Sequence, residues 1–163
     1  MARVNPSRMT HRYEGELVIF LIGMGINRPW RPDLWLPVFV AMPRMLRELF
    51  SDPDSGLTGM RMTIGARGPV LVQYWNSLDK LYAYASNPNA EHRPAWAAFN
   101  RRARKAPGAV GIWHETFAVS KAESLYVGMP PSGLALATES VPVAAHSNEA
   151  RGRMASGRTG GAV

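Results

Sequence analysis

The residues best suited to chemistry lie in the stretch 111–117, where an imidazole and a carboxylate interrupt an apolar, strand-like run. These two residues are His114 and Glu115. An imidazole can donate or accept a hydrogen bond, carry a charge near neutral pH or bind a metal. Because burying an unpaired polar group costs about 1–3 kcal/mol, we expect His114 either to be bonded locally or to face a cavity.

Other polar and aromatic side chains could approach the same cleft from the ends of two predicted strands. They are Tyr74, Trp75 and Asn76 on one side and Arg28 and Trp30 on the other. An apolar pocket with a few directed polar groups is the usual small-molecule site. Packing in the core or in a dimer interface is the competing interpretation for Trp75 and for Trp113.

The remaining motifs exclude several kinds of site. The chain has no cysteine, which excludes disulfides, thiolate metal sites and cysteine nucleophiles. The four histidines lack the spacing of metal ligands, so we expect no metal site made of protein ligands alone. His11 and His146 are expected to be solvated, whereas His92 could cap a helix, pack or reach the cleft. A Gly-x-Gly pair at 23–25 lacks the third glycine of a dinucleotide site.

Composition bounds the possible partners. A chain of 163 residues with 46% hydrophobic residues fits one globular domain with tails. The net charge of +7 comes largely from terminal arginines and from a cluster at 101–105, which suits a helix C-terminus. We therefore expect no nucleic-acid partner. No apolar stretch reaches 18 residues, so no membrane span is expected, and the chain is predicted to be cytoplasmic.

Hydrophobic periodicity predicts the order of the elements. Strands are expected at 16–25, 57–67, 69–76 and 109–119, with helices at 34–50, from 77 to 86 and at 90–105. This order predicts an α+β fold of ferredoxin-like type, with a four-stranded antiparallel sheet and helices on one face. The uncovered face predicts a homodimer. Residues 1–12 are expected to form an arm, 13–135 the domain and 136–163 a flexible tail.

Several segments carry a resemblance to a known family. They are Phe20–Met24, Trp35–Pro37, Met45–Leu49, Gln73–Trp75 and Gly111–Thr116. Over roughly residues 12–135 the chain resembles the dimeric α/β-barrel superfamily. More closely, it resembles the antibiotic-biosynthesis-monooxygenase-like branch related to a fungal terpenoid-pathway monooxygenase, often catalogued as a domain of unknown function.

The resemblance implies a dimeric α/β barrel with a pocket between sheet and helices in each subunit. Better-known relatives are small oxygenases that act on electron-rich polyketides without metal or flavin. Others bind haem, including haem-degrading enzymes and aldoxime dehydratases. Because the oxygenases commonly use Asn, Trp, Arg and Tyr side chains around the substrate, the resemblance suggests such roles for Asn76, Trp75, Arg28 and Tyr74.

The leading hypothesis is a cofactor-free, small-molecule monooxygenase of secondary metabolism that acts on an apolar or aromatic metabolite. The expected catalytic residues are His114 as general base, Arg28 as a stabiliser of negative charge, and Asn76. The expected substrate-binding residues are Trp75, Tyr74, Trp113, Trp30 and Glu115. One alternative is a haem protein with His114 or His92 as axial ligand. Another is a non-catalytic ligand-binding dimer, so the sequence leaves open whether the chain is an enzyme.

Overall fold

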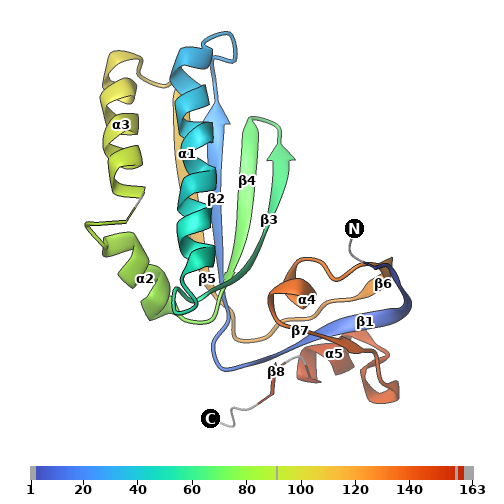
Figure 1. Cartoon of the computed structure of the whole chain (residues 1–163). Coiled ribbons are helices and arrows are strands. Elements are labelled where there is room, and N and C mark those ends of the chain that lie inside the picture. Colours follow the sequence, from blue (N-terminus) through green and yellow to red (C-terminus); the bar gives the residue numbers. More distant parts are fainter. Residues whose placement is uncertain (1–2, 91, 157, 160–163) are drawn as a thin grey trace.

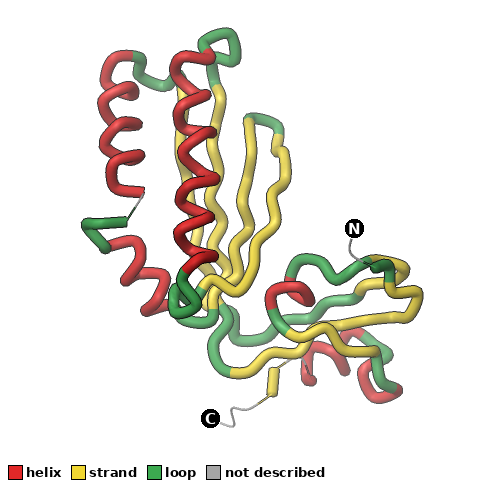
Figure 2. The backbone as a smooth tube through the Cα atoms, viewed as in Figure 1, coloured by secondary structure: helices red, strands yellow, loops and turns green. Residues whose placement is uncertain are grey.

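The computed structural model describes residues 3–90, 92–156 and 158–159, and it contains two antiparallel sheets. The larger sheet lies against three helices, and the smaller sheet lies beside one end of it (Figure 1). Figure 2 shows the same division, with the long helices confined to one face of the larger sheet.

The larger sheet has the predicted ferredoxin-like arrangement. Its strands are β2 (Val18–Ile26), β3 (Leu57–Gly65), β4 (Gly68–Trp75) and β5 (Val110–Ala118), in the spatial order β3-β4-β2-β5. All three strand pairs are antiparallel. The helices are α1 (Pro32–Ser51), α2 (Leu78–Ser86) and α3 (His92–Lys105). The predicted α+β class and the four-stranded antiparallel sheet with helices on one face are confirmed.

Alternation along β4 builds the core beneath the helices. Leu71, Gln73 and Trp75 are buried on the helix side, while Val72 and Tyr74 lie on the opposite face. Trp75 belongs to a buried cluster with residues of β2, β3, α1 and α2, namely Val18, Leu49, Leu57 and Leu81. Such a cluster holds the helices to the sheet through burial of apolar surface.

Local signals set the helix boundaries. Ser77 begins α2 as its N-cap, because its hydroxyl accepts a hydrogen bond from the Lys80 backbone N–H at 3.4 Å. A proline, Pro32, begins α1, where its missing N–H costs nothing. The helix then continues through Pro37 and Pro43, although Pro43 removes an interior hydrogen bond.

The smaller sheet corrects the expected arm and tail. Its strands are β1 (Asn5–Glu14), β6 (Tyr126–Met129), β7 (Glu139–Pro142) and β8 (Arg158–Thr159), and β1 pairs with all three others. The chain also forms α4 (Leu134–Ala137), the 3-10 helix η1 (Ala145–Ser147) and α5 (Ala150–Ser156). The expected boundaries, 12/13 and 135/136, therefore fall inside β1 and α4. Residues 1–2, 157 and 160–163 of the expected arm and tail lie outside the described residues.

Polar partners explain why apolar periodicity missed this sheet. The Thr10 hydroxyl donates to the Ser124 carbonyl at 2.8 Å, so β1 is tied to a segment far along the chain. Buried Arg153 forms an ion pair with Glu123 at 2.5 Å and donates to the Asn148 carbonyl at 2.7 Å. Buried polar groups are tolerated when they are hydrogen-bonded, and here they supply part of the interior.

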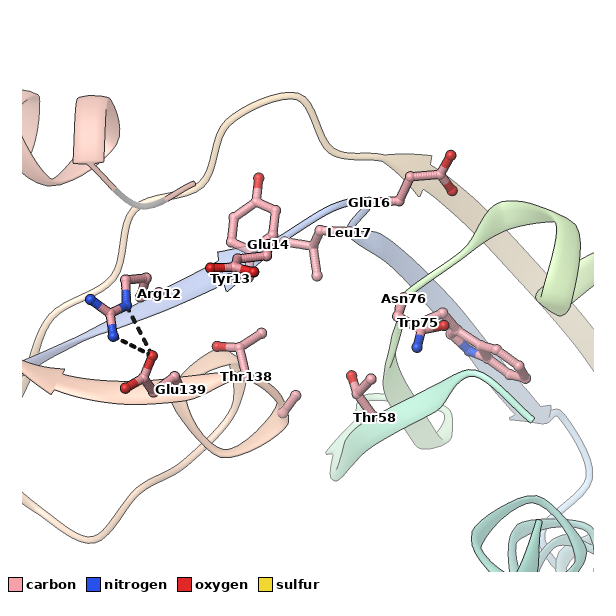
Figure 3. A pocket seen from close by; sticks show the side chains of 11 residues that line it. Arg12, Tyr13, Glu14, Glu16, Leu17, Thr58, Trp75, Asn76, Thr138 and Glu139 are labelled. Atoms are coloured by element: carbon pink, nitrogen blue, oxygen red, sulfur yellow. Dashed lines mark hydrogen bonds and ion pairs between the residues drawn. The ribbon is translucent and has the colours of Figure 1, made fainter. Parts of the chain in front are cut away.

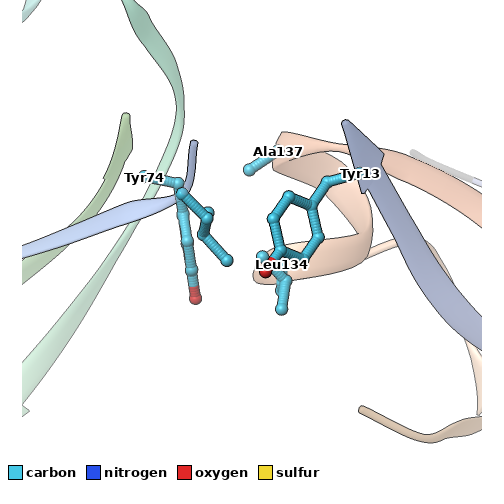
Figure 4. Packing of buried hydrophobic residues seen from close by; sticks show 5 residues of the cluster. Tyr13, Tyr74, Leu134 and Ala137 are labelled. Carbon is cyan, nitrogen blue, oxygen red and sulfur yellow. The ribbon is translucent and has the colours of Figure 1, made fainter. Parts of the chain in front are cut away.

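An apolar cluster joins the two sheets. Tyr74 extends from β4 toward Tyr13 of β1 and toward Leu134 and Ala137 of α4 (Figure 4). These residues cover one end of the sheet face that the helices leave open. The chain itself therefore covers part of the surface that the sequence assigned to a second subunit.

His11 is the clearest correction among the histidines. Its side chain is only 1% exposed, whereas the sequence predicted a solvated residue. Its Nδ1 lies 2.7 Å from the Ser124 Oγ, and its ring stacks on that of Tyr13 with centroids 5.8 Å apart. Burial lowers the pKa of His11 below its ordinary value, and the charge of Glu123 acts in the opposite direction.

Gly59 of β3 lies close to Ala137 of α4, and this contact yields a stability prediction. A Cβ at this position would stand 2.7 Å from the Ala137 Cβ and 3.0 Å from its Cα. We expect Gly59→Ala to reduce the free energy of unfolding by about 1–3 kcal/mol, as overpacking does. Urea denaturation would measure this loss. Gly111→Ala is the matched control, because nothing lies within 4 Å of that Cβ, and equal losses in the two variants would contradict the prediction.

The lowered pKa of His11 predicts a pH dependence of stability. The unfolded chain takes up a proton near pH 6.5, before the folded chain does, so acidification favours unfolding. This contribution to stability is complete above pH 6.5 and is lost as the pH falls toward the lower folded-state pKa. Unfolding free energies measured from pH 8 to 5 should therefore fall more steeply for the native chain than for His11→Gln. Parallel curves would refute this assignment.

Candidate functional site

A pocket of about 710 Å³ separates the helices from β2 and β5. Its walls are mostly apolar, and they include Phe20 and Ile22 of the sheet and Val38 of α1. A smaller compartment of about 200 Å³ adjoins it and shares these three residues. Such a concave apolar volume with a few polar groups is the common form of a small-molecule site.

His114 stands at the sheet wall of the larger pocket. It lies opposite Ile22 in the pairing of β5 with β2, and its ring centroid is 5.6 Å from that of Phe20. Within the part of the chain that the structure describes, no side chain or carbonyl forms a hydrogen bond with its ring. The imidazole therefore faces the cavity, and His114 is exposed to solvent there rather than buried.

An aromatic and polar group closes the smaller compartment. The Trp75 Nε1–H donates to the Gln73 Oε1 at 3.1 Å, which pairs the indole N–H with the amide oxygen in the interior. The Trp75 ring also packs at a tilt against Tyr84, with centroids 6.3 Å apart. The Tyr84 hydroxyl in turn donates to the Glu48 Oε2 at 3.1 Å. Trp75 thus has the packing role that was the competing interpretation, while its side chain also lines the compartment.

His92 connects α2 to α3 and lines both compartments. Its Nε2 donates to the Ala85 carbonyl at 3.0 Å, and its ring lies 5.1 Å from that of Tyr84. The Nδ1 atom is buried and has no hydrogen-bond partner among the described residues. Because Nε2 is already bonded, only Nδ1 remains available to a ligand.

The helices contribute arginines that the sequence argument did not select as site residues. Arg44 of α1 and Arg93 and Arg102 of α3 line the larger pocket together with His92 and His114. Helical spacing could have identified Arg44, because it lies three residues after Ala41 and seven after Pro37 and so shares their side of α1. The same spacing applies to α3, where Trp96 and Phe99 are the residues expected to face inward: Arg93 lies three residues before Trp96, and Arg102 lies three residues after Phe99.

The other residues expected to bind substrate lie elsewhere. Trp113 and Glu115 are on the face of β5 opposite the helices, as strand alternation requires. Tyr74 is buried in the cluster between the sheets, where burial raises the pKa of its hydroxyl. Arg28 and Trp30 are exposed on the loop between β2 and α1, and neither lines the larger pocket. The structure does not bring these residues to His114.

Asn76 lines a separate hollow of about 280 Å³ between the two sheets. Figure 3 shows this hollow, with Asn76 and Thr58 on one side and the Arg12–Glu139 ion pair on the other. That ion pair has an N–O distance of 2.7 Å and is exposed. Asn76 is therefore not a neighbour of His114 in the larger pocket, and proximity along the chain to Trp75 does not place it there.

Two further properties concern the described residues as a whole. They contain no group of three or more His, Asp or Glu side chains positioned to hold a metal ion. None of the helices that they form has the length and apolar character of a membrane span.

Comparisons with known proteins support the family and the fold. A family model described as "Monooxygenase af470-like" matches residues 17–134. None of the curated proteins matches the chain. A crystal structure of an aldoxime dehydratase in complex with butyraldoxime has 18% identity and a TM-score of 0.63. The match covers 84% of this chain but 43% of that one, so the chain spans less than half the length of the dehydratase. At this identity the likeness shows the fold alone.

Two smaller proteins align over most of their own lengths. The cofactor-independent oxygenase SnoaB from Streptomyces nogalater has 12% identity and a TM-score of 0.42, covering 66% of this chain and 97% of that one. A dimeric ferredoxin-like protein of unknown function from Thermobifida fusca has 16% identity and a TM-score of 0.44, covering 66% and 94%.

Proposed function

The chain belongs to the monooxygenase af470-like family, and on this basis we propose that it is a monooxygenase acting on an apolar or aromatic small molecule. The observation that carries the proposal is the unbonded imidazole of His114 at the wall of an apolar pocket of about 710 Å³. A polar group held in such a place without a partner is suited to act on whatever occupies the pocket.

In the proposed reaction His114 removes a proton from an activated C–H of the substrate. The carbanion transfers one electron to O₂, and the resulting radical pair combines to form a C–O bond in a hydroperoxide. Loss of water then leaves a ketone, so a CH₂ group and O₂ yield C=O and H₂O. One oxygen atom enters the product and the other leaves as water, and no external reductant is required. Arg28 has no part in this scheme, because it lies on the exposed loop.

The alternative function is haem binding, and the same unbonded imidazole favours it. His114 or His92 would hold the haem iron, because the ring of His114 has no hydrogen bond and the Nδ1 of His92 has no partner among the described residues. The arginines Arg44, Arg93 and Arg102 could pair with the haem propionates. Bound haem would supply oxygen activation or aldoxime dehydration. The chain's own residues would hold it and exclude water.

We also infer that a second copy of the chain covers the part of the sheet face that remains open. Trp113 and Phe117 on this face are 40% and 49% exposed. Ile19, Leu21 and Val72 lie on the same face and are half-buried. Large adjoining apolar side chains on an exposed surface are typical of an interface between subunits.

The catalytic proposal predicts a loss of turnover in His114→Gln. With anthrone as the substrate and O₂ consumption as the assay, we expect kcat to fall by about 100-fold or more, the usual contribution of a general base. Glu115→Gln is the matched control, because it changes the neighbouring residue on the opposite face of β5 and should keep most of the activity.

Three outcomes separate the candidate functions. Undiminished turnover in His114→Gln would contradict the role of this residue as base. A Soret band in the purified protein that disappears in His114→Gln would favour haem binding, whereas a colourless protein that takes up no haemin would contradict it. Binding of small molecules with neither turnover nor haem would leave the non-catalytic ligand-binding dimer.

The dimer proposal predicts that Trp113→Glu combined with Phe117→Glu yields a monomer, because two buried charges would oppose association. Light scattering coupled to gel filtration would measure the mass. The control is Trp30→Glu, since Trp30 is 71% exposed but lies on the loop before α1. A native chain that is monomeric at all concentrations would exclude this interface.

A further inference from the structure

We propose that the larger pocket selects an apolar organic acid, with the anionic group held by arginines of the helices and the apolar body held between sheet and helices. The inference rests on the proposed function because it names the substrate class of the same pocket. The substrate class follows from the charges of the residues that line the pocket. Those charges are the same whichever reaction the protein catalyses.

The charged groups along the walls of the pocket all have one sign. Arg44 enters from α1, and Arg93 and Arg102 enter from α3. None of the described residues that line the pocket is an aspartate or glutamate. A cleft with one sign of charge and low-dielectric walls concentrates the field inside it, so it attracts ligands of the opposite sign.

The three arginines have no ion-pair partner among the described residues. Among the described residues, ion pairs hold Arg12 to Glu139, Arg31 to Asp33 and Arg153 to Glu123, and the arginines of the pocket are among the many that have no such partner. Arg44 and Arg93 are exposed and Arg102 is half-buried, so an anion in the pocket can reach a guanidinium that has no other charged partner. Its planar array of donors matches a carboxylate in particular.

The helix dipoles do not account for the positions of all three arginines. Arg102 lies in the last turn of α3, where the helix dipole favours a cation. Arg93 is the second residue of the same helix, so the dipole opposes its charge. Arg44 lies in the interior of α1, away from either end. The dipole therefore accounts for Arg102 alone, whereas an anion in the pocket would attract all three arginines.

The remaining lining defines the rest of the ligand. Trp96 and Phe99 of α3 stack with ring centroids 5.3 Å apart, and both line the pocket. Phe20 and Ile112 line it from the sheet. The arginines come from the helices and His114 comes from the sheet, so an acid bound to the arginines would place its apolar body toward the imidazole.

The test compares two probes that share one ring system, 2-naphthoate and the neutral 2-naphthylmethanol. Calorimetric titration at low salt should show naphthoate binding at least about tenfold more tightly. Arg44→Gln and Arg102→Gln should each weaken naphthoate about tenfold, the usual effect of losing one charged hydrogen bond. Neither substitution should change the affinity for naphthylmethanol. Far-UV circular dichroism would confirm that each variant is folded.

The matched controls are Arg47→Gln on α1 and Arg104→Gln on α3. Each removes the same charge from the same helix, but neither residue lines this pocket, so naphthoate affinity should stay within about twofold. Equal affinity for the two probes, equal losses in the control variants, or no binding of naphthoate would each overturn the inference.

Anthrone turnover, measured separately, distinguishes this inference from the proposed function. Selective binding of naphthoate by a protein that consumes no O₂ would support the inference and contradict the oxygenase. Turnover of anthrone by a protein that binds both probes equally would support the oxygenase and overturn the inference.

Discussion

The register of β4 is the constraint on which the rest of the molecule depends. Two consecutive aromatic residues of this strand point to opposite faces and occupy separate cores. Trp75 packs with the helices, while Tyr74 joins the larger sheet to the smaller one. A slip of one residue would exchange these faces, and it would carry Trp75 and its hydrogen-bond partner Gln73 together to the face away from the helices. One strand thus fixes the helix layer, the second sheet and one wall of the smaller compartment.

The pocket exists because small side chains stand where the helices face β5. The pocket is lined by four alanines, Ala41, Ala85, Ala95 and Ala98. An alanine side chain is too short to reach the sheet. Larger residues at these positions would fill the volume, since protein interiors otherwise pack without voids of this size. The apolar stripes of the helices therefore do two things. Near α2 and near the end of α1 their side chains pack against the sheet. Beside His114 they leave an opening.

Sequence patterns predicted the parts of this structure that depend on local periodicity. Alternation placed Leu71, Gln73 and Trp75 on one face, and it also separated His114 from Glu115. The smaller sheet could not be predicted in this way, because its interior contains polar residues such as His11 and Arg153. Their partners lie in distant parts of the chain, and no local window contains them. Arg28 and Asn76 were expected at the cleft, yet a strand end does not reveal which cavity it adjoins.

The pairing of β1 with strands from the far end of the chain has a consequence for biosynthesis. Thr10 of β1 is hydrogen-bonded to a residue 114 positions later, and β7 follows later still. On the ribosome β1 emerges first and must wait, with its backbone groups unpaired, while the whole larger sheet is translated. Docking of the smaller sheet is then the last step, and until it occurs Tyr74 stays uncovered. Translation speed and chaperone access while β6 and β7 are being made therefore bear on the yield of native protein.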